Sequence, residues 1–292
     1  MKRIAWIFLA AFALLGCGQK KVADSPDQIA VSILPQEYFV NRIAGDKFKV
    51  NVMIPPGASP ATYEPTPAQL TSLSGADLYL KIGFTGFELA WMEKIASVNK
   101  EMKIVDLSEG VSLITEMSTH DHGNGNDDHH GGIDPHIWLS PVNAKIISSN
   151  ICKALSERFP EYSDEFNSNL DEFLLELDSL DSTIRSELSG LSSRTFFTYH
   201  PSLSYYARDY DLEQLSLELG GKTPSPTHMK YLVDTGKEKK IGLVFLQMQF
   251  DQKNAEVLAK EIDAEIVQIN PLDPEWHQQM LFITEKLAEN LK

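Results

Sequence analysis

The sequence contains few cysteines, no long apolar run and no surplus of positive charge. Cys17 and Cys152 are its only cysteines, which excludes a scaffold built on disulfides. The apolar run between Ile4 and Leu15 is shorter than the roughly 20 residues that a membrane-spanning helix needs. Lysine and arginine number 26, against 41 aspartates and glutamates. Because nucleic acid is bound by basic surfaces, a nucleic-acid partner is not expected.

The sequence also lacks the motifs of common hydrolases and nucleotide-binding enzymes. It has no H-E-x-x-H pair, no G-x-S-x-G elbow and no glycine loop that would cradle a phosphate. A zinc enzyme would need three protein ligands, an open coordination position and usually a nearby general base. We therefore expect a binding protein that is not an enzyme.

The N-terminal end of the chain has the pattern of a secretory signal. Lys2 and Arg3 precede the apolar run, and Gly16 stands directly before Cys17. This arrangement resembles the bacterial lipobox, in which the cysteine is acylated after cleavage. We expect lipidation at Cys17, followed by a polar tether, and a mature protein anchored to a membrane of the cell envelope, facing the periplasm or the extracellular space. A signal that is cut elsewhere and discards Cys17 is the alternative.

Strand-like and helical segments alternate in two parts of the chain. Strands separated by helices indicate parallel βαβ units, because parallel strands need a long crossover connection. The expected strands are 29–34, 50–54, 78–82, 103–106, 195–199, 215–219, 243–246 and 265–269. The expected helices are 37–43, 67–74, 88–97, 203–210, 227–237, 253–262 and 275–290.

A long helical pattern lies between these two parts. Apolar residues recur at the spacing of one helix face from residue 161 to residue 188. A helix over this range would be about 42 Å long at roughly 1.5 Å per residue. Pro160 separates it from a shorter helix over 142–158, in which Cys152 is expected to be a packed core thiol.

These patterns predict an α/β protein made of two βα lobes with mostly parallel sheets, joined by one long backbone helix. A ligand of such a fold would lie in the cleft between the lobes, near the carboxyl ends of strands. The expected divisions are a signal over 1–16, a tether over 17–27, an N-terminal lobe over 28–140 with a loop over 116–132, a helical linker over 141–192 and a C-terminal lobe over 193–292.

Four of the eight histidines lie in the loop over 116–132. His120, His122, His129 and His130 stand among glycine, asparagine and aspartate residues, which cannot build a packed core. Their imidazoles can bind a metal ion, but flexible ligands lose conformational entropy at every contact. We therefore regard these histidines as candidate ligands of a loose metal site. A solvated loop with no role is the alternative.

Two other histidines have better defined surroundings. His136 stands in the segment D-P-H-I-W-L-S-P, between two prolines and beside apolar residues that should be buried. His200 follows the strand over 195–199 in the second lobe and precedes Pro201. Neutral imidazole is a common metal ligand, and a histidine at a strand end can point into the cleft. One histidine from each lobe could therefore bind a single ion.

Several motifs occur in a fixed order along the chain. They are I-P-P-G-A-S-P-A-T-Y-E-P-T-P over 54–67, G-A-D-L over 75–78, the histidine-rich loop, D-P-H-I-W-L-S-P over 134–141, Y-H-P-S over 199–202 and Y-Y-A over 205–207. Together they resemble the zinc- and manganese-binding solute-binding proteins of metal ABC importers, across nearly the whole mature chain. The resemblance implies two lobes on one long helix and an ion held by three histidines plus a carboxylate or water. His136 and His200 match two of these ligands.

The chain departs from the family at two ligand positions. Ala61 stands where the family has a histidine and cannot bind an ion. Asn270 stands where the family has an aspartate, and its amide oxygen is a weak, neutral zinc ligand. Glu64, on the same loop as Ala61, could compensate, or it could cap the helix that begins nearby. A loop histidine such as His130 is a further candidate, and Asp273 is a weaker one.

The resulting expectation is a zinc-binding receptor that captures the ion between two lobes and delivers it to an ABC permease in the inner membrane, as a monomer. The candidate ligands are His136, His200, Glu64 and Asn270. Manganese is the alternative ion, although imidazoles favour zinc. The alternative function is that of a weakly binding relative which acts as a metal chaperone or adhesin. His228 and His277 lie in helical patterns and are expected on the surface.

Overall fold

The structure, a computed structural model, describes residues 28–115, 132–250 and 252–292. Cys17 and the four loop histidines, His120, His122, His129 and His130, lie outside the described residues, so their predicted roles stay predictions. No helix in the described part of the chain combines the length and the apolar character needed to cross a bilayer.

The strands form two separate four-stranded sheets, each fully parallel. The first has the order β2-β1-β3-β4 and the second the order β6-β5-β7-β8. In each sheet the first strand of the lobe lies between the second and the third, and the fourth strand is at an edge. The strands are β1 (Gln28–Val31), β2 (Lys49–Val52), β3 (Ala76–Lys81), β4 (Lys103–Asp106), β5 (Thr195–Thr198), β6 (Glu213–Ser216), β7 (Leu243–Gln247) and β8 (Glu265–Ile269). The predicted strands and their parallel arrangement are confirmed.

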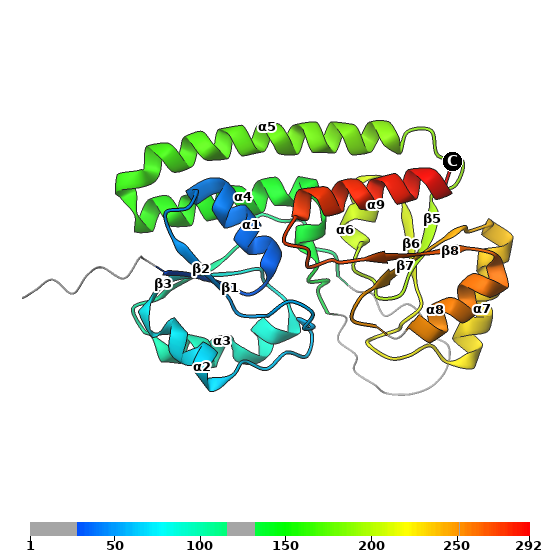
Figure 1. The fold of residues 1–292 in the computed structure, drawn as a ribbon, viewed down its shortest axis with the longest axis horizontal. Coiled ribbons are helices and arrows are strands. Elements are labelled where there is room, and N and C mark those ends of the chain that lie inside the picture. The colour runs from blue at the N-terminus through cyan, green and yellow to red at the C-terminus, as the bar shows by residue number, and fades with distance from the viewer. Residues whose placement is uncertain (1–27, 116–131, 251) are drawn as a thin grey trace, which may run out of the picture.

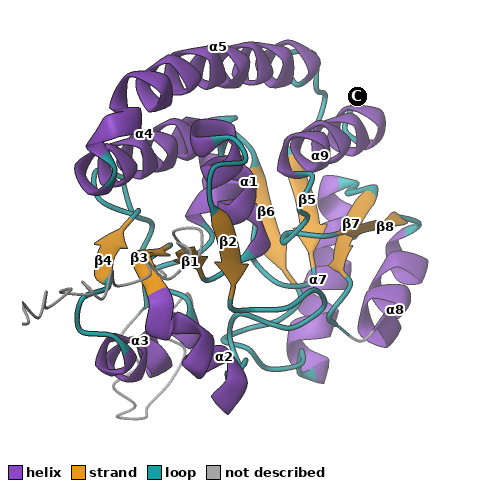
Figure 2. Cartoon of the chain, turned by 60° about the vertical axis from the view of Figure 1, so that its left-hand side comes forward, coloured by secondary structure: helices purple, strands orange, loops and turns teal. Residues whose placement is uncertain are grey.

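Helices connect the strands and cover the sheets (Figure 2). They are α1 (Leu34–Ala44), α2 (Pro67–Ser72), α3 (Gly86–Val98), α4 (Pro141–Arg158), α5 (Ser163–Glu187), α6 (Ser204–Asp209), α7 (Pro226–Lys239), α8 (Gln252–Ile262) and α9 (Trp276–Asn290). Four of them begin with the same local chemistry. The side chains of Thr66, Thr85, Ser140 and Ser225 accept a hydrogen bond from the backbone N–H three residues on, which satisfies a donor left free at a helix start.

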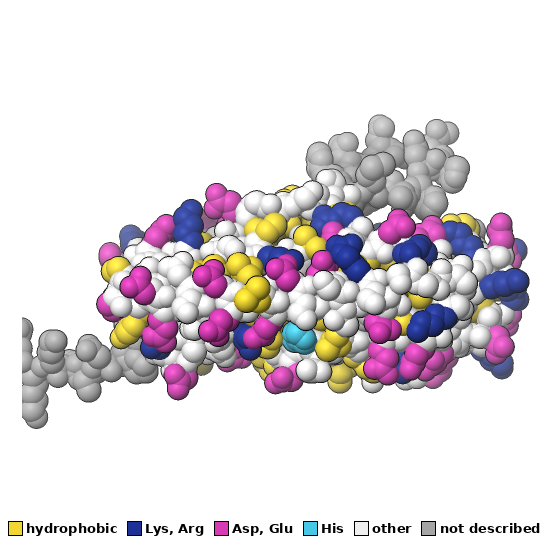
Figure 3. All heavy atoms as spheres, turned by 90° about the horizontal axis from the view of Figure 1, so that it is seen from above, with side chains coloured by type: hydrophobic (Ala, Val, Ile, Leu, Met, Phe, Trp, Pro, Cys, Tyr) yellow, Lys and Arg dark blue, Asp and Glu magenta, His cyan; other side chains and the backbone are white. Residues whose placement is uncertain are grey.

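The predicted long helix is present as α5, which has 25 residues and runs above both sheets (Figure 1). It packs against α1 and α4 near the first sheet and against α9 near the second. One face of α5 is buried through Phe166, Phe173, Leu177, Leu180 and Ile184, as the apolar spacing predicts. Seen from above, the outer surface carries acidic and basic side chains interspersed (Figure 3). The helix therefore holds the two lobes together on one side.

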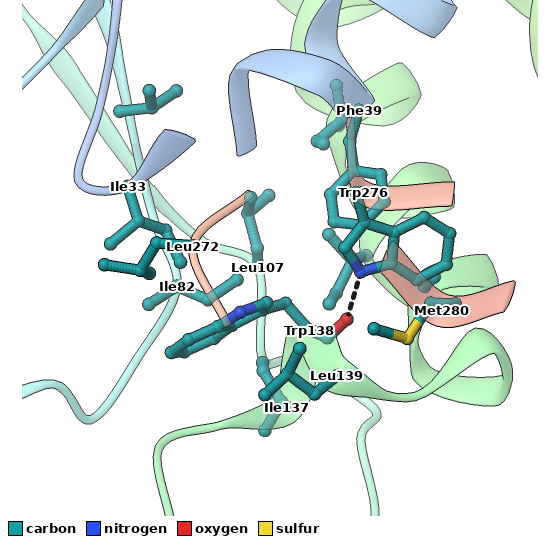
Figure 4. Packing of buried hydrophobic residues seen from close by; sticks show 14 of the residues in the cluster. Ile33, Phe39, Ile82, Leu107, Ile137, Trp138, Leu139, Leu272, Trp276 and Met280 are labelled. Carbon is teal, nitrogen blue, oxygen red and sulfur yellow. Dashed lines mark hydrogen bonds between the residues drawn. The ribbon is translucent and has the colours of Figure 1, made fainter. Parts of the chain in front are cut away.

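A shared apolar core also lies between the two lobes (Figure 4). Leu272 and Trp276 of the second lobe belong to the same buried cluster as Ile33 and Ile82 of the first. The indole N–H of Trp276 donates to the backbone oxygen of Trp138 over 2.8 Å. The Trp138 indole N–H in turn donates to the backbone oxygen of Pro271, also over 2.8 Å. These contacts fix how the loops at the base of the cleft meet.

Candidate metal site

The loops at the carboxyl ends of the strands enclose a cavity of about 510 Å³ between the lobes. Its walls come from the loops that follow β2 and β3 in the first lobe, from those that follow β5, β6, β7 and β8 in the second, and from the segment around His136. Open parallel sheets place ligands at this end of their strands. The cleft location predicted from the strand pattern is therefore where the structure has its cavity.

His136 is held at the cavity by the loop that precedes α4. The Asp134 carboxylate accepts hydrogen bonds from the His136 backbone N–H, over 2.9 Å, and from its ring Nδ1, over 2.8 Å. The Tyr205 hydroxyl donates to the backbone oxygen of Asp134 over 2.8 Å. Burial would raise the pKa of Asp134, but the hydrogen bonds that it accepts from His136 outweigh burial and lower it. Asp134 therefore remains an acceptor and fixes the Nδ1–H tautomer of His136, with Nε2 free to bind.

His200 is held in a matching way in the second lobe. Its Nδ1 lies 2.7 Å from the Glu218 carboxylate, whose side chain is only 6% exposed. Gln247, at the end of β7, accepts from the His200 backbone N–H over 3.1 Å and donates to its backbone oxygen over 2.7 Å. Glu218 and Gln247 come from the two strand ends that flank β5. The ring of His200 therefore also has its Nδ1 occupied and its Nε2 turned to the cavity.

The two imidazoles meet across the cleft. Nε2 of His136 lies 3.2 Å from Nε2 of His200. With both Nδ1 atoms donating to carboxylates, both Nε2 atoms of the neutral rings are acceptors, and two such acceptors at this distance repel each other unless a proton or a metal cation lies between them. Two nitrogens bound to one tetrahedral zinc at 2.0–2.1 Å stand about 3.3 Å apart. The separation of the two Nε2 atoms thus suits shared coordination of one ion.

Aromatic rings flank the two histidines. Phe250 stacks on His200 with ring centroids 5.2 Å apart and an angle of 19° between the rings. Trp138 lies beside His136 with a centroid distance of 5.3 Å. These rings restrict the rotation of the imidazoles and reduce the contact of the site with water. The histidines are consequently preorganised, with side-chain exposures of 12% for His136 and 25% for His200.

Across the cavity, the first lobe contributes small side chains on a loop that is tightly held. The backbone N–H of Phe87 donates to the Pro60 oxygen over 2.8 Å. Gly86 lies directly against Ala61, because a Cβ atom at Gly86 would be 2.4 Å from the Ala61 backbone oxygen. Thr85, just before Gly86, caps α3. The Ala61 methyl group therefore occupies a fixed wall of the cavity and offers no ligand atom.

The other predicted ligands lie elsewhere. Glu64 is exposed and does not line the cavity, and the cap of α2 is Thr66. Asn270 also does not line the cavity; its side-chain oxygen accepts from the Leu272 backbone N–H over 3.1 Å. Asp273 accepts from the Glu275 backbone N–H over 2.9 Å and closes a local turn. The structure therefore brings His136 and His200 together, but not Glu64, Asn270 or Asp273.

The remaining histidines of the described chain lie away from the cavity. His228 is on α7, where its ring stacks with Tyr231 and its Nε2 lies 3.3 Å from the Ser216 oxygen. His277 is on α9, and burial lowers its pKa. Within the described residues, no group of three or more histidine, cysteine, aspartate or glutamate side chains is arranged to hold an ion.

Three residues of the site have no role predicted from the sequence. Asp134 belongs to the D-P-H-I-W-L-S-P motif without an expected function, and Glu218 and Gln247 belong to none of the motifs. A signal for Asp134 existed, because an acidic residue two positions before a histidine can reach its Nδ1. Gln247 ends a wholly buried strand of otherwise apolar residues, which also marks it. Nothing local marks Glu218, since its partner lies 18 residues away.

The comparison with known families agrees with this geometry. A family model described as the zinc-uptake complex component A, periplasmic, or ZnuA, matches residues 29–290. The chain belongs to the ZnuA family. The match covers both lobes and the long helix, and so includes every element that borders the cavity.

Individual relatives of the ZnuA family show the extent of the likeness. The zinc-binding lipoprotein AdcA of Streptococcus pneumoniae is 29% identical over 94% of this chain, but the chain spans only 56% of that protein's length. The high-affinity zinc uptake system protein ZnuA of Bacillus subtilis is 27% identical over 92% of this chain and 88% of its own length. A crystal structure of a zinc-bound ZnuA deletion mutant is 38% identical and covers 91% of this chain and 98% of its own, with a TM-score of 0.84.

Proposed function

We propose that the protein is a zinc receptor that captures one ion in the cleft and delivers it to the membrane permease of an ABC importer. The ion is the cargo of the site, and His136 and His200 are its protein ligands. The observation that carries the proposal is the 3.2 Å separation of their Nε2 atoms, with both Nδ1 atoms held by carboxylates. This arrangement directs two lone pairs toward one point, where a bound metal cation would relieve their repulsion.

Zinc is the ion that the site supports best. Imidazole is a preferred ligand of zinc, whereas manganese is bound mainly by carboxylate and water oxygens. The carboxylates of Asp134 and Glu218 are hydrogen-bonded to the Nδ1 atoms, on the side of each ring that faces away from the proposed ion, and so are not its ligands. The names of the relatives also refer to zinc binding and zinc uptake. Manganese is the competing ion in any measurement of selectivity.

The remaining parts of the proposal concern location and partners. Acylation at Cys17 would anchor the mature protein to a membrane, facing the periplasm or the extracellular space, and the name of AdcA includes lipoprotein. A monomer would then pass its ion to the permease. The proposed role is binding without a catalytic step, in keeping with a family described by uptake. Whole-cell zinc uptake that depends on Cys17 and on both cleft histidines is the expected result of this arrangement.

A zinc titration of the mature protein against a chelating dye tests the proposal. His136→Ala and His200→Ala should each weaken zinc binding by more than the roughly 10- to 100-fold that loss of an outer-shell partner costs. His228→Ala is the matched control and should leave the affinity unchanged, because its ring lies on α7. Replacing His120, His122, His129 and His130 together by alanine separates the cleft from the loop. Affinity that survives both cleft substitutions and vanishes with the loop histidines would refute the proposed site.

A further inference from the structure

The proposed zinc site has two protein ligands and a cavity of about 510 Å³ beside them. Among the residues that the structure describes, no third histidine, cysteine, aspartate or glutamate is arranged with His136 and His200 to hold an ion. A four-coordinate ion would therefore keep two positions open. These positions can be filled by water, by a small molecule that enters the cavity, or by residues outside the described ranges, which include the four loop histidines.

The size of the cavity favours a small molecule. Its volume of about 510 Å³ far exceeds the space of an ion and two waters, since a water occupies about 30 Å³ of the liquid. It falls within the range of about 300–1,000 Å³ that is typical of sites for small organic ligands. Many of the side chains that line it cannot bind an ion at all: Pro60, Ala61, Pro135, Trp138, Pro201, Phe250 and Leu272.

The walls of the cavity are too well held to collapse onto the ion. The Ala61 loop is fixed by the hydrogen bond of Phe87 to Pro60 and by its close approach to Gly86. On the other side, the indole of Trp138 is anchored to the Pro271 oxygen. Space of this kind beside a metal ion, with apolar and aromatic surfaces around it, suits a planar ligand that can bind the ion and pack against the walls.

The charges at the site indicate the chemical class of the ligand. The side chains of Asp134 and Glu218 are 2% and 6% exposed, and each contacts one of the imidazoles. Their two negative charges balance the two positive charges of a zinc ion. A neutral nitrogen donor keeps this balance, whereas an anionic ligand would leave an uncompensated buried charge.

We propose that the cleft binds zinc together with a small neutral nitrogen-donor ligand of the imidazole class, which coordinates the ion and occupies the cavity next to Ala61. This inference rests on the proposed zinc site at His136 and His200. The protein is thus a receptor for a zinc complex, and the third imidazole is supplied by the bound molecule. No covalent bond is formed or broken apart from coordination to the ion.

The test measures zinc affinity with and without imidazole as the probe. It uses the mature protein with alanine at His120, His122, His129 and His130, so that these side chains cannot supply the donor. Imidazole at about ten times its dissociation constant from the zinc-loaded site should raise the apparent zinc affinity by about tenfold, after correction for zinc complexes in solution. Acetate under the same conditions should not. Native mass spectrometry should show one imidazole bound per zinc-loaded protein.

Two substitutions of alanine by histidine provide the matched comparison. Ala61→His places an imidazole on the cavity wall, and should tighten zinc binding and abolish the effect of added imidazole. Ala68→His adds the same side chain at an exposed position on α2 away from the cavity, and should keep the imidazole effect of the parent. Circular dichroism establishes that both variants are folded.

The outcomes separate this inference from the proposed function. If zinc binding depends on His136 and His200 but imidazole fails to strengthen it, the receptor survives and the co-ligand is refuted. The same conclusion follows if acetate acts as strongly as imidazole, or if Ala61→His binds zinc no more tightly than Ala68→His. If zinc binding does not depend on the two cleft histidines, both proposals fall.

Discussion

The carboxylate behind His200 offers a sharp test of how the site binds its ion. In the native protein the Nδ1 atom of His200 lies 2.7 Å from the Glu218 carboxylate. Glu218→Gln removes one negative charge but keeps a side-chain oxygen that can still accept this N–H. The change therefore isolates the effect of charge from that of ring orientation. Glu218 is buried and touches no ion directly, so that any loss of zinc affinity would be transmitted through the imidazole.

The expected size of the effect follows from the geometry. An ion about 2.1 Å beyond Nε2 would lie roughly 7 Å from the Glu218 carboxylate. A double positive and a single negative charge at that distance attract by about 1 kcal/mol in bulk water and about 5 kcal/mol at an effective dielectric constant of 20. His200 is 25% exposed, which places the site between these limits. We expect a 10- to 100-fold loss of affinity, equivalent to about 1.4–2.7 kcal/mol.

Competition for zinc with a dye of known affinity measures this loss. Glu213→Gln is the matched control, because Glu213 lies at the start of the strand that leads to Glu218 and pairs with Lys239 away from the cavity. The control should bind zinc as the native protein does. An affinity of Glu218→Gln within about twofold of native would show that the carboxylate does not tune the ligand, and the electrostatic reasoning would be wrong.

Three further changes test the framework around the site. Gly86→Ala should lower the free energy of unfolding by about 1–3 kcal/mol in urea titrations, because the new Cβ would stand 2.4 Å from the Ala61 backbone oxygen. Gly75→Ala is the control and should change the free energy of unfolding little, because nothing beyond its neighbours in the chain lies within 4 Å of the new Cβ. Trp138→Phe should cost about 1–3 kcal/mol in the same assay by leaving the Pro271 oxygen without its donor. Burial raises the pKa of Glu88 above its ordinary 4.5, so native stability should fall as pH rises from 4.5 through that raised pKa. Glu88→Gln should remove this slope; urea titrations between pH 4 and pH 8 in which the slope persists would contradict the assignment.

The sequence predicts the architecture because the fold depends on local and repeated patterns. The apolar spacing along α5 and the alternation of strands and helices are present in the chain itself, and they suffice for two parallel sheets on one long helix. His136 and His200 could also be predicted, since His136 stands between two prolines just before a helix and His200 follows a strand and precedes Pro201. The prediction that they meet follows from assigning one histidine to each lobe.

The supporting residues depend instead on strand order, which no local pattern contains. Glu218 and Gln247 reach His200 only because β6 and β7 flank β5 in the sheet. Glu64 was chosen as a ligand for its nearness to Ala61 in the chain, but distance along a loop says nothing about direction. Asn270 was chosen by resemblance, and its side chain is used by the turn that leads to Leu272. Whether each of these side chains points toward the cavity depends on the three-dimensional arrangement of the strands and loops, which no local sequence pattern contains.

The core behind the cleft limits how the proposed receptor could respond to an ion. Leu272 and Trp276 pack with Ile33 and Ile82 in one apolar cluster, so opening the cleft widely would expose surface from both lobes. Each square ångström of apolar surface exposed costs about 25 cal/mol, so the cost of opening the cleft rises with the apolar area that is uncovered. The two imidazoles are also already at the separation that zinc requires. The proposed site is therefore largely formed before the ion arrives, which lowers the cost of ordering its ligands on binding.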